Sequence, residues 1–213
     1  MRNAGWLFLL LTGALAADEV KFDTPEARVI QSVTSPGQRS PTHQHQANRV
    51  LIFLDSGHES VTGANGQTME RRFHAGEVAW APASGPHSSD NVGATTFRVV
   101  EVELKGAGGA LPATDLDPLR VAPEHYKVEF ENPQVRVLRV HYDPQQAGPM
   151  HEHILNRVMV FLTDAKVKVT AADGSVQMMN ANAGDVRTGG AIKHQEANVS
   201  LQPVEVLVVE LKR

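Results

Sequence analysis

The 213-residue chain contains no cysteine, which excludes disulfide bonds, thiolate metal ligands and thiol nucleophiles. Its net charge is only −4, so it lacks the basic surface that binds nucleic acid or anionic lipid. Beyond the N-terminal residues, no apolar run is long enough to span a bilayer. We therefore expect no nucleic-acid partner and no membrane span in the mature chain.

The N-terminus has the features of a secretory signal in the expected order. Arg2 precedes an apolar run over residues 6–11, and Ala14-Leu15-Ala16 supplies the small residues of a cleavage site. We expect residues 1–16 to be removed as a signal peptide, which predicts a periplasmic or secreted protein. A buried N-terminal helix or a retained membrane anchor is the alternative.

The rest of the chain is an internal duplication. Residues 22–54 align without a gap on residues 130–162, at an offset of 108. The match resumes near the end of each copy, where Glu103-Leu104-Lys105 recurs as Glu210-Leu211-Lys212 at an offset of 107. The second copy has therefore lost one residue. The intervening stretch is rich in glycine and proline, so we predict domains over 17–105 and 125–213 joined by a linker over 106–124.

Short apolar segments bounded by glycine, proline, aspartate or serine predict strands. Two of them, 50–54 and 158–162, are apolar throughout, which indicates a strand covered on both faces. One face would line a barrel, and the other would pack on a second sheet, the sister domain or another subunit. Asn65-Gly66 and Asp173-Gly174 predict tight hairpin turns. The pattern as a whole predicts an all-β fold with two tandem barrels or sandwiches.

Six of the ten histidines occupy repeated positions. Histidines at i and i+2 of a strand share a face, and a third can approach from another strand. Neutral imidazole is a good ligand for Fe, Mn, Zn, Ni or Cu. We predict a divalent transition metal, of a kind the sequence leaves open, at two triads: His43, His45 and His87, and His151, His153 and His194. The alternative is a relic of duplication in which these histidines bond each other or water.

These histidines resemble the two motifs of the cupin superfamily. The first motif is a glycine, five residues, His-x-His and then a glutamate, and Gly37 stands at that distance before His43. The second is a glycine, a proline-glycine turn, a histidine, three residues and an asparagine, which matches Gly76, Pro82, Gly85, His87 and Asn91. The second copy has Gly184, His194 and Asn198, with a shortened turn at Gly189-Gly190. The resemblance implies a bicupin: two tandem double-stranded β-helix, or jelly-roll, barrels in one chain.

Both copies depart from the family where its glutamate ligand falls, because Arg49 and Arg157 stand there. Strand parity predicts that Arg49 shares the histidine face, where a guanidinium and a divalent ion repel each other. The arginine could turn to a carboxylate or backbone carbonyl, the metal could be absent, or an anionic substrate could lie between them. The last arrangement makes Arg49 and Arg157 candidate substrate-orienting residues. A structural ion pair is the alternative.

Other polar residues near the motifs are less suitable as metal ligands or site residues. Asn48 and Asn156 could offer an amide ligand only if a bulge shifts the register. Glu152 lies between two inward histidines and is expected to face outward. Asn91 and Asn198 are expected at turns or strand ends. The four histidines without counterparts are expected at the surface or at edges: His58, His74, His125 and His141.

These observations predict an exported metal-binding bicupin. It would be a metal-dependent enzyme of the oxygenase, isomerase or lyase type, with a small organic substrate that is anionic if the arginines orient it. The alternative is a non-catalytic binding or scaffold protein in which one or both metal sites are lost. The sequence leaves the substrate, the reaction and the oligomeric state, including a possible homodimer, open.

Overall fold

The computed structural model describes residues 18–212, which form eighteen strands and one short helix. The first half contains β1 (Glu19–Asp23), β2 (Ala27–Thr34), β3 (His43–His45), β4 (Arg49–Phe53), β5 (Gly57–Gly63), β6 (Thr68–Phe73), β7 (Val78–Ala81), β8 (Ser84–Asn91) and β9 (Phe97–Leu104). After α1 (Pro118–Val121), the second half contains β10 (Tyr126–Glu131), β11 (Val135–Tyr142), β12 (His151–His153), β13 (Arg157–Phe161), β14 (Ala165–Ala171), β15 (Val176–Ala181), β16 (Val186–Gly189), β17 (Ile192–Asn198) and β18 (Val204–Leu211).

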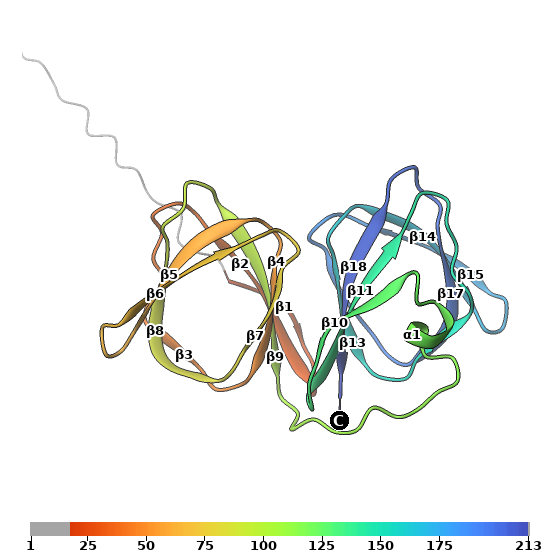
Figure 1. Ribbon diagram of the computed structural model, residues 1–213, viewed down its shortest axis with the longest axis horizontal. Helices are drawn as coiled ribbons and strands as arrows, with labels where there is room; N and C mark the ends of the chain where they lie inside the picture. The colour runs from red at the N-terminus through yellow and green to blue at the C-terminus, as the bar shows by residue number, and fades with distance from the viewer. Residues whose placement is uncertain (1–17, 213) are drawn as a thin grey trace, which may run out of the picture.

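The two halves repeat the same topology, strand for strand. Each has a five-stranded sheet, β1-β2-β9-β4-β7 or β10-β11-β18-β13-β16. Each also has a four-stranded sheet, β3-β8-β5-β6 or β12-β17-β14-β15. Two barrels result, side by side (Figure 1). The predicted fold class, all-β with two tandem jelly-roll barrels, is confirmed.

The predicted hairpin turns are also present. Gly66 and Gly174 adopt φ angles of 76° and 84°, which favour glycine. The Gly66 amide donates to the Gly63 carbonyl and the Gly174 amide to the Ala171 carbonyl, both at 2.9 Å. These turns connect β5 to β6 and β14 to β15, the outer hairpin of each barrel.

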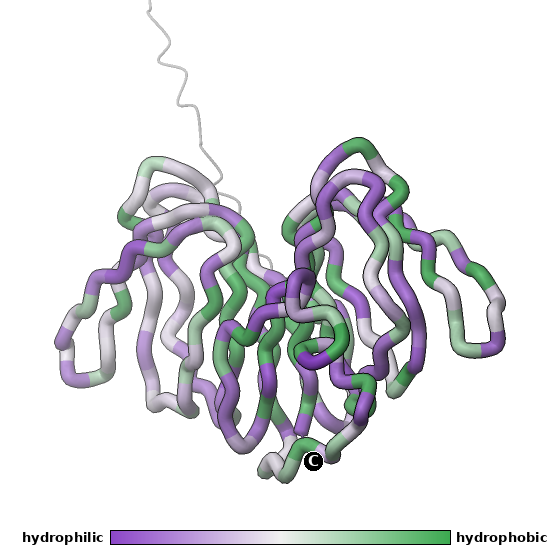
Figure 2. Tube along the Cα trace, turned by 45° about the vertical axis from the view of Figure 1, so that its right-hand side comes forward, coloured by the Kyte–Doolittle hydropathy of each residue, from purple (hydrophilic) through white to green (hydrophobic). Residues whose placement is uncertain are grey.

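The apolar strands β4 and β13 are covered on both faces because the barrels pack against each other. Val50 and Ile52 belong to one buried cluster that also contains valines and leucines of the second barrel. Leu51 and Phe53 face the other way, into a cluster inside the first barrel. Figure 2 shows the apolar segments gathered between the barrels. The second face could have packed on a second sheet, the sister domain or another subunit, and the structure shows the sister domain.

Symmetric polar contacts also join the barrels. The Asn48 amide donates to Gln134 Oε1 at 2.6 Å, and the Asn156 amide donates to Glu26 Oε1 at 3.0 Å. Glu26 and Gln134 occupy equivalent positions, since 134 − 26 = 108. Both asparagines therefore link the barrels, which speaks against the amide-ligand alternative.

The stretch predicted as a linker lies against the second barrel (Figure 1). Asp117 caps α1 by accepting from the Leu119 amide at 2.9 Å, and its other oxygen binds Arg136 at 2.7 Å. Glu152 faces outward, as predicted, and accepts a hydrogen bond from the Thr114 hydroxyl at 2.6 Å. The predicted signal peptide lies outside the described residues. Within residues 18–212, no helix has the length and apolarity to cross a membrane.

Candidate metal centres

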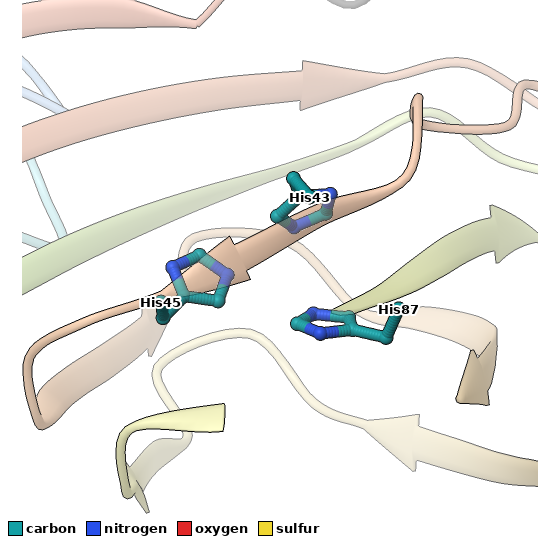
Figure 3. Close-up of side chains that lie close together, drawn as sticks. All are labelled: His43, His45 and His87. Atoms are coloured by element: carbon teal, nitrogen blue, oxygen red, sulfur yellow. The ribbon is translucent and has the colours of Figure 1, made fainter. Parts of the chain in front are cut away.

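The fold brings each predicted histidine triad together. The short strands β3 and β12 carry the His-x-His pairs, which pair with β8 and β17 so that His43 lies opposite His87 and His151 opposite His194. In each triad the candidate ligand atoms all lie within 4.8 Å of one another. Figure 3 shows the three imidazoles of the first barrel converging from two strands. The geometry is that of two sites able to hold a metal ion.

Backbone carbonyls set the tautomer of three rings. Nδ1 of His43 lies 2.9 Å from the Pro41 carbonyl oxygen, and Nδ1 of His87 lies 2.9 Å from that of Gly85. Nδ1 of His151 lies 3.0 Å from the Pro149 carbonyl oxygen. Because a carbonyl only accepts, each Nδ1 carries the proton, and Nε2 keeps its lone pair for a ligand bond.

A buried glutamate orients the remaining His-x-His ring of the second barrel. His153 Nδ1 lies 2.8 Å from Glu210 Oε1, and Arg136 Nε donates to the other carboxylate oxygen at 2.6 Å. The first barrel has a looser equivalent, with 3.6 Å between His45 Nδ1 and Glu103 Oε1. The sequence comparison matched Glu103 with Glu210 but missed this role. The sequence signal that could have revealed this role is the position of both glutamates in the repeated Glu-Leu-Lys segment.

Burial favours the neutral form of three triad histidines, His45, His151 and His194, because it lowers their pKa. The second triad is the more enclosed: His151, His153 and His194 are 0%, 3% and 3% exposed. Burial lowers the pKa of His194 to about 4 against the opposing effect of Glu196, and burial also lowers the pKa of His151. In the first barrel, burial and the Arg49 charge lower the pKa of His45 to about 4. Neutral imidazole is the form that binds metals.

Arg49 lies inside the first triad. Its Nη1 donates to His45 Nε2 at 2.6 Å and contacts Glu101 Oε2 at 2.7 Å. The predicted shared face and the turn toward a carboxylate are both observed. The guanidinium engages the lone pair that a metal would need, so the arginine opposes metal binding in this barrel.

Arg157 lies away from the second triad. Its Nη1 donates to the backbone carbonyl of Gly190, in the shortened turn. The neighbouring strand explains the difference, because Arg157 lies opposite Gly189 whereas Arg49 lies opposite Ala81. A Cβ at position 189 would come within 3.2–3.4 Å of the Arg157 guanidinium. The glycine therefore leaves room for the retracted arginine.

Tyr126 and Glu196 complete the second site, and sequence reasoning missed both. The Tyr126 hydroxyl lies 3.0 Å from His151 Nε2 and 3.0 Å from Glu196 Oε2. Burial and the Glu196 charge raise the pKa of Tyr126 well above its ordinary value, so it remains a phenol. Burial raises the pKa of Glu196, but the three histidines outweigh burial and the net shift is downward, so it remains a carboxylate.

The second site has more acceptors than donors. The Tyr126 hydroxyl has one proton to donate, but it lies beside two acceptors, His151 Nε2 and Glu196 Oε2. In addition, neither ring nitrogen of His194 has a hydrogen-bond partner among the described residues. Unsatisfied buried polar atoms are costly. A bound cation would satisfy the converging lone pairs, so the residues present fit a divalent metal.

A small cavity of about 30 Å³ adjoins this site, with room for one or two water molecules. Its polar wall contains Tyr126, His153, Arg157 and Glu196, and its apolar wall contains Val140, Tyr142, Met159, Phe161, Val167, Met179, Val204, Val206 and Val208. Arg157 therefore borders the same cavity as His153 and Glu196, while its Nη1 donates to the Gly190 carbonyl.

One expectation about the unmatched histidines is wrong. His125 is only 3% exposed, stacks on Tyr142 at 4.0 Å between ring centres, and donates from Nδ1 to the His141 carbonyl at 3.0 Å. His74 and His141 are exposed as expected, while His58 is half-buried. Asn91 and Asn198 lie at strand ends, where their amides donate to backbone carbonyls.

Comparison with known proteins agrees with this geometry. Residues 32–103, which form most of the first barrel, match the family model described as a cupin domain. These residues are a cupin domain. The second barrel repeats the cupin topology, and the recognition of a two-domain cupin protein is confirmed. No curated protein sequence matches the chain.

Solved structures share the two-barrel cupin architecture. AerE from Microcystis aeruginosa aligns over 96% of both chains, with a TM-score of 0.69 and 13% identity. A single-residue variant of oxalate decarboxylase from Bacillus subtilis aligns over 92% of this chain and 72% of its own, with a TM-score of 0.63 and 15% identity. Another structure of that enzyme comes from a study of its Mn(II) centres. It aligns over 88% of this chain and 69% of its own, with a TM-score of 0.59 and 14% identity. At these identities the likeness shows the fold alone.

Proposed function

We propose that this cupin protein is an exported metal-binding bicupin whose second barrel contains the active metal site. His151, His153 and His194 would hold a divalent transition metal there, and the centre would act on a small, anionic organic substrate. The excess of buried acceptors in this barrel carries the proposal. The first triad remains a predicted metal site, which Arg49 opposes.

A metal bound there would supply a Lewis acid or an oxygen-binding centre. The chain's own residues prepare the surroundings. Glu210 fixes the ring of His153, and Tyr126 keeps a proton to donate. Arg157 borders the cavity and has five N–H donors, so it would pair with a substrate carboxylate. The apolar wall would exclude bulk water.

The size of the cavity limits the substrate. About 30 Å³ accepts only one or two water-sized groups, so a larger molecule requires Arg157 or Tyr126 to move. Oxalate, the substrate named for the structurally similar decarboxylase, is one small dianion of the class that suits Arg157. Manganese is one of the metals that suits the imidazoles, together with Fe, Zn, Ni and Cu.

The N-terminal sequence supports export. Intact-mass measurement of protein recovered from the periplasm or medium tests this part, with a mature chain starting near Ala17 expected. Recovery of the full-length chain from the cytoplasm alone would refute it.

The competing function is a non-catalytic binding or scaffold protein. The first barrel favours it, because a guanidinium there binds the ligand atom of His45. The same contact is absent between Arg157 and the second triad among the hydrogen bonds of residues 18–212.

Elemental analysis of the purified protein separates these functions. We expect about one equivalent of metal per chain, lost in His151→Ala and retained in the matched variant His43→Ala. Loss in equal parts from both variants would show that both barrels bind metal. A folded wild-type protein that binds no added transition metal would refute the metal site and support the non-catalytic binding or scaffold function.

A further inference from the structure

The second barrel has a carboxylate near its histidines, although the position of the family's glutamate holds Arg157. Glu196 follows His194 by two residues on β17, so the two side chains share a face of the strand. We propose that Glu196 is the fourth metal ligand of this barrel, supplied from β17 instead of from the segment after His-x-His. This inference rests on the proposed function, because it requires metal at the second triad.

The distances suit a ligand. Glu196 Oε1 lies 3.7 Å from His194 Nε2. Two donors bound about 2.1 Å from one ion, at tetrahedral or octahedral angles, lie about 3.0–3.4 Å apart. A shift of a few tenths of an ångström therefore brings the carboxylate to ligand distance from His194. The group of ligand atoms within 4.8 Å of one another contains the three histidines alone, so the carboxylate must also approach His151 and His153. Its other oxygen is linked to His151 Nε2 through the Tyr126 hydroxyl, at 3.0 Å for each step.

A carboxylate would also balance part of the charge of a bound ion. Three neutral imidazoles leave the charge of a divalent ion uncompensated. An uncompensated charge in a buried site is costly. The Glu196 side chain is 18% exposed and is the charged acid closest to His194 among the ion pairs of the described residues. It reduces the net charge where the ion would lie.

The first barrel lacks this group. Position 89 is equivalent to 196, since 196 − 107 = 89, and it holds serine. That barrel also has Ala81 in place of Gly189 and keeps its arginine within the triad. In the first barrel the nearby carboxylate, Glu101, pairs with Arg49, whereas in the second barrel Arg157 binds the Gly190 carbonyl and a carboxylate lies beside His194. Both differences favour a cation in the second barrel.

Cobalt(II) titration of the metal-free full-length protein tests the ligand. Calorimetry would measure affinity, and visible absorption would report the ligand field. In Glu196→Gln we expect affinity to fall at least about 10- to 100-fold, the loss that removal of an outer hydrogen-bond partner already causes, together with a changed spectrum. The matched variant Glu152→Gln removes the same charge from an outward-facing residue and should leave both unchanged. Glu196→Asp, which keeps a carboxylate, should recover part of the affinity.

The Tyr126→Phe variant separates ligation from positioning. It removes the hydroxyl that contacts Glu196 and His151 but keeps the carboxylate, so we expect the cobalt spectrum of the wild type. A Tyr126→Phe spectrum equal to that of Glu196→Gln would show that Glu196 acts only through the tyrosine, which overturns the proposal. Wild-type affinity and spectrum in folded Glu196→Gln would also overturn it and leave the three-histidine site standing. A wild-type protein that binds no cobalt would overturn the proposed function itself.

Discussion

The buried His194 gives the metal-free protein a stability that depends on pH. Burial lowers the pKa of its imidazole from 6.5 to about 4 in the folded state. Between these values the unfolded chain binds a proton that the folded protein does not. Stability is therefore present above pH 6.5 and falls as the pH decreases toward 4. Linkage over this interval gives a loss of about 3 kcal/mol in the free energy of unfolding between pH 7 and pH 4.

Urea denaturation in the presence of a chelator, followed by circular dichroism, would measure this loss. Comparison with His194→Asn isolates the contribution, because the carboxylates titrate in both proteins and largely cancel in the difference. We expect the wild type to lose about 3 kcal/mol more than the variant from pH 7 to pH 4. Equal pH profiles would show that the His194 imidazole is not buried as a neutral group and is not ready to bind a metal.

Three substitutions test the other parts of the site. Glu210→Gln removes one charge from a buried pair with Arg136, so we expect a loss of about 3 kcal/mol in urea denaturation. It also frees the His153 ring, so we expect about 10- to 100-fold weaker metal binding by calorimetry. Gly189→Ala places a Cβ within 3.2–3.4 Å of the Arg157 guanidinium, which should push the arginine toward the triad and lower the metal content. Arg49→Gln removes the guanidinium that binds His45 Nε2, so elemental analysis should find a second equivalent of metal per chain.

Each of these tests can fail clearly. Unchanged stability in Glu210→Gln would contradict the buried ion pair, and Glu103→Gln provides the matched variant with a smaller expected effect, since Glu103 is 17% exposed. Full metal content in Gly189→Ala would show that the glycine does not control the arginine. A stoichiometry that stays at one in Arg49→Gln would mean that the first triad fails for another reason.

The sequence predicted the features that depend on local pattern and spacing. Period-two parity placed the His-x-His pairs on one face of β3 and β12, and the continuous apolar runs predicted that β4 and β13 are covered on both faces. These predictions succeed because strand geometry fixes which side chains share a face. The duplication helped further, because each signal occurs twice.

The features that were missed depend on contacts between distant strands. Tyr126 reaches His151 from β10, and Glu210 reaches His153 from the last strand. His125, in the turn before β10, is buried because Tyr142 of β11 stacks on its ring. None of these positions belongs to a cupin motif, so motif spacing carries no information about them. Glu196 differs from these residues. It follows His194 by two positions, so the sequence alone could have predicted that the two side chains share a face of the strand.

The packing of the barrels gives the first of them a task that does not depend on its histidines. Val50 and Ile52 point toward the neighbouring barrel, whereas Arg49 lies on the opposite face of the same strand. Changes at the histidine cluster therefore leave the apolar wall on which the second barrel rests untouched. Separating the two barrels would expose that wall to water on both of them. The first barrel therefore contributes buried contacts to the second through Val50 and Ile52, whatever its histidine cluster binds.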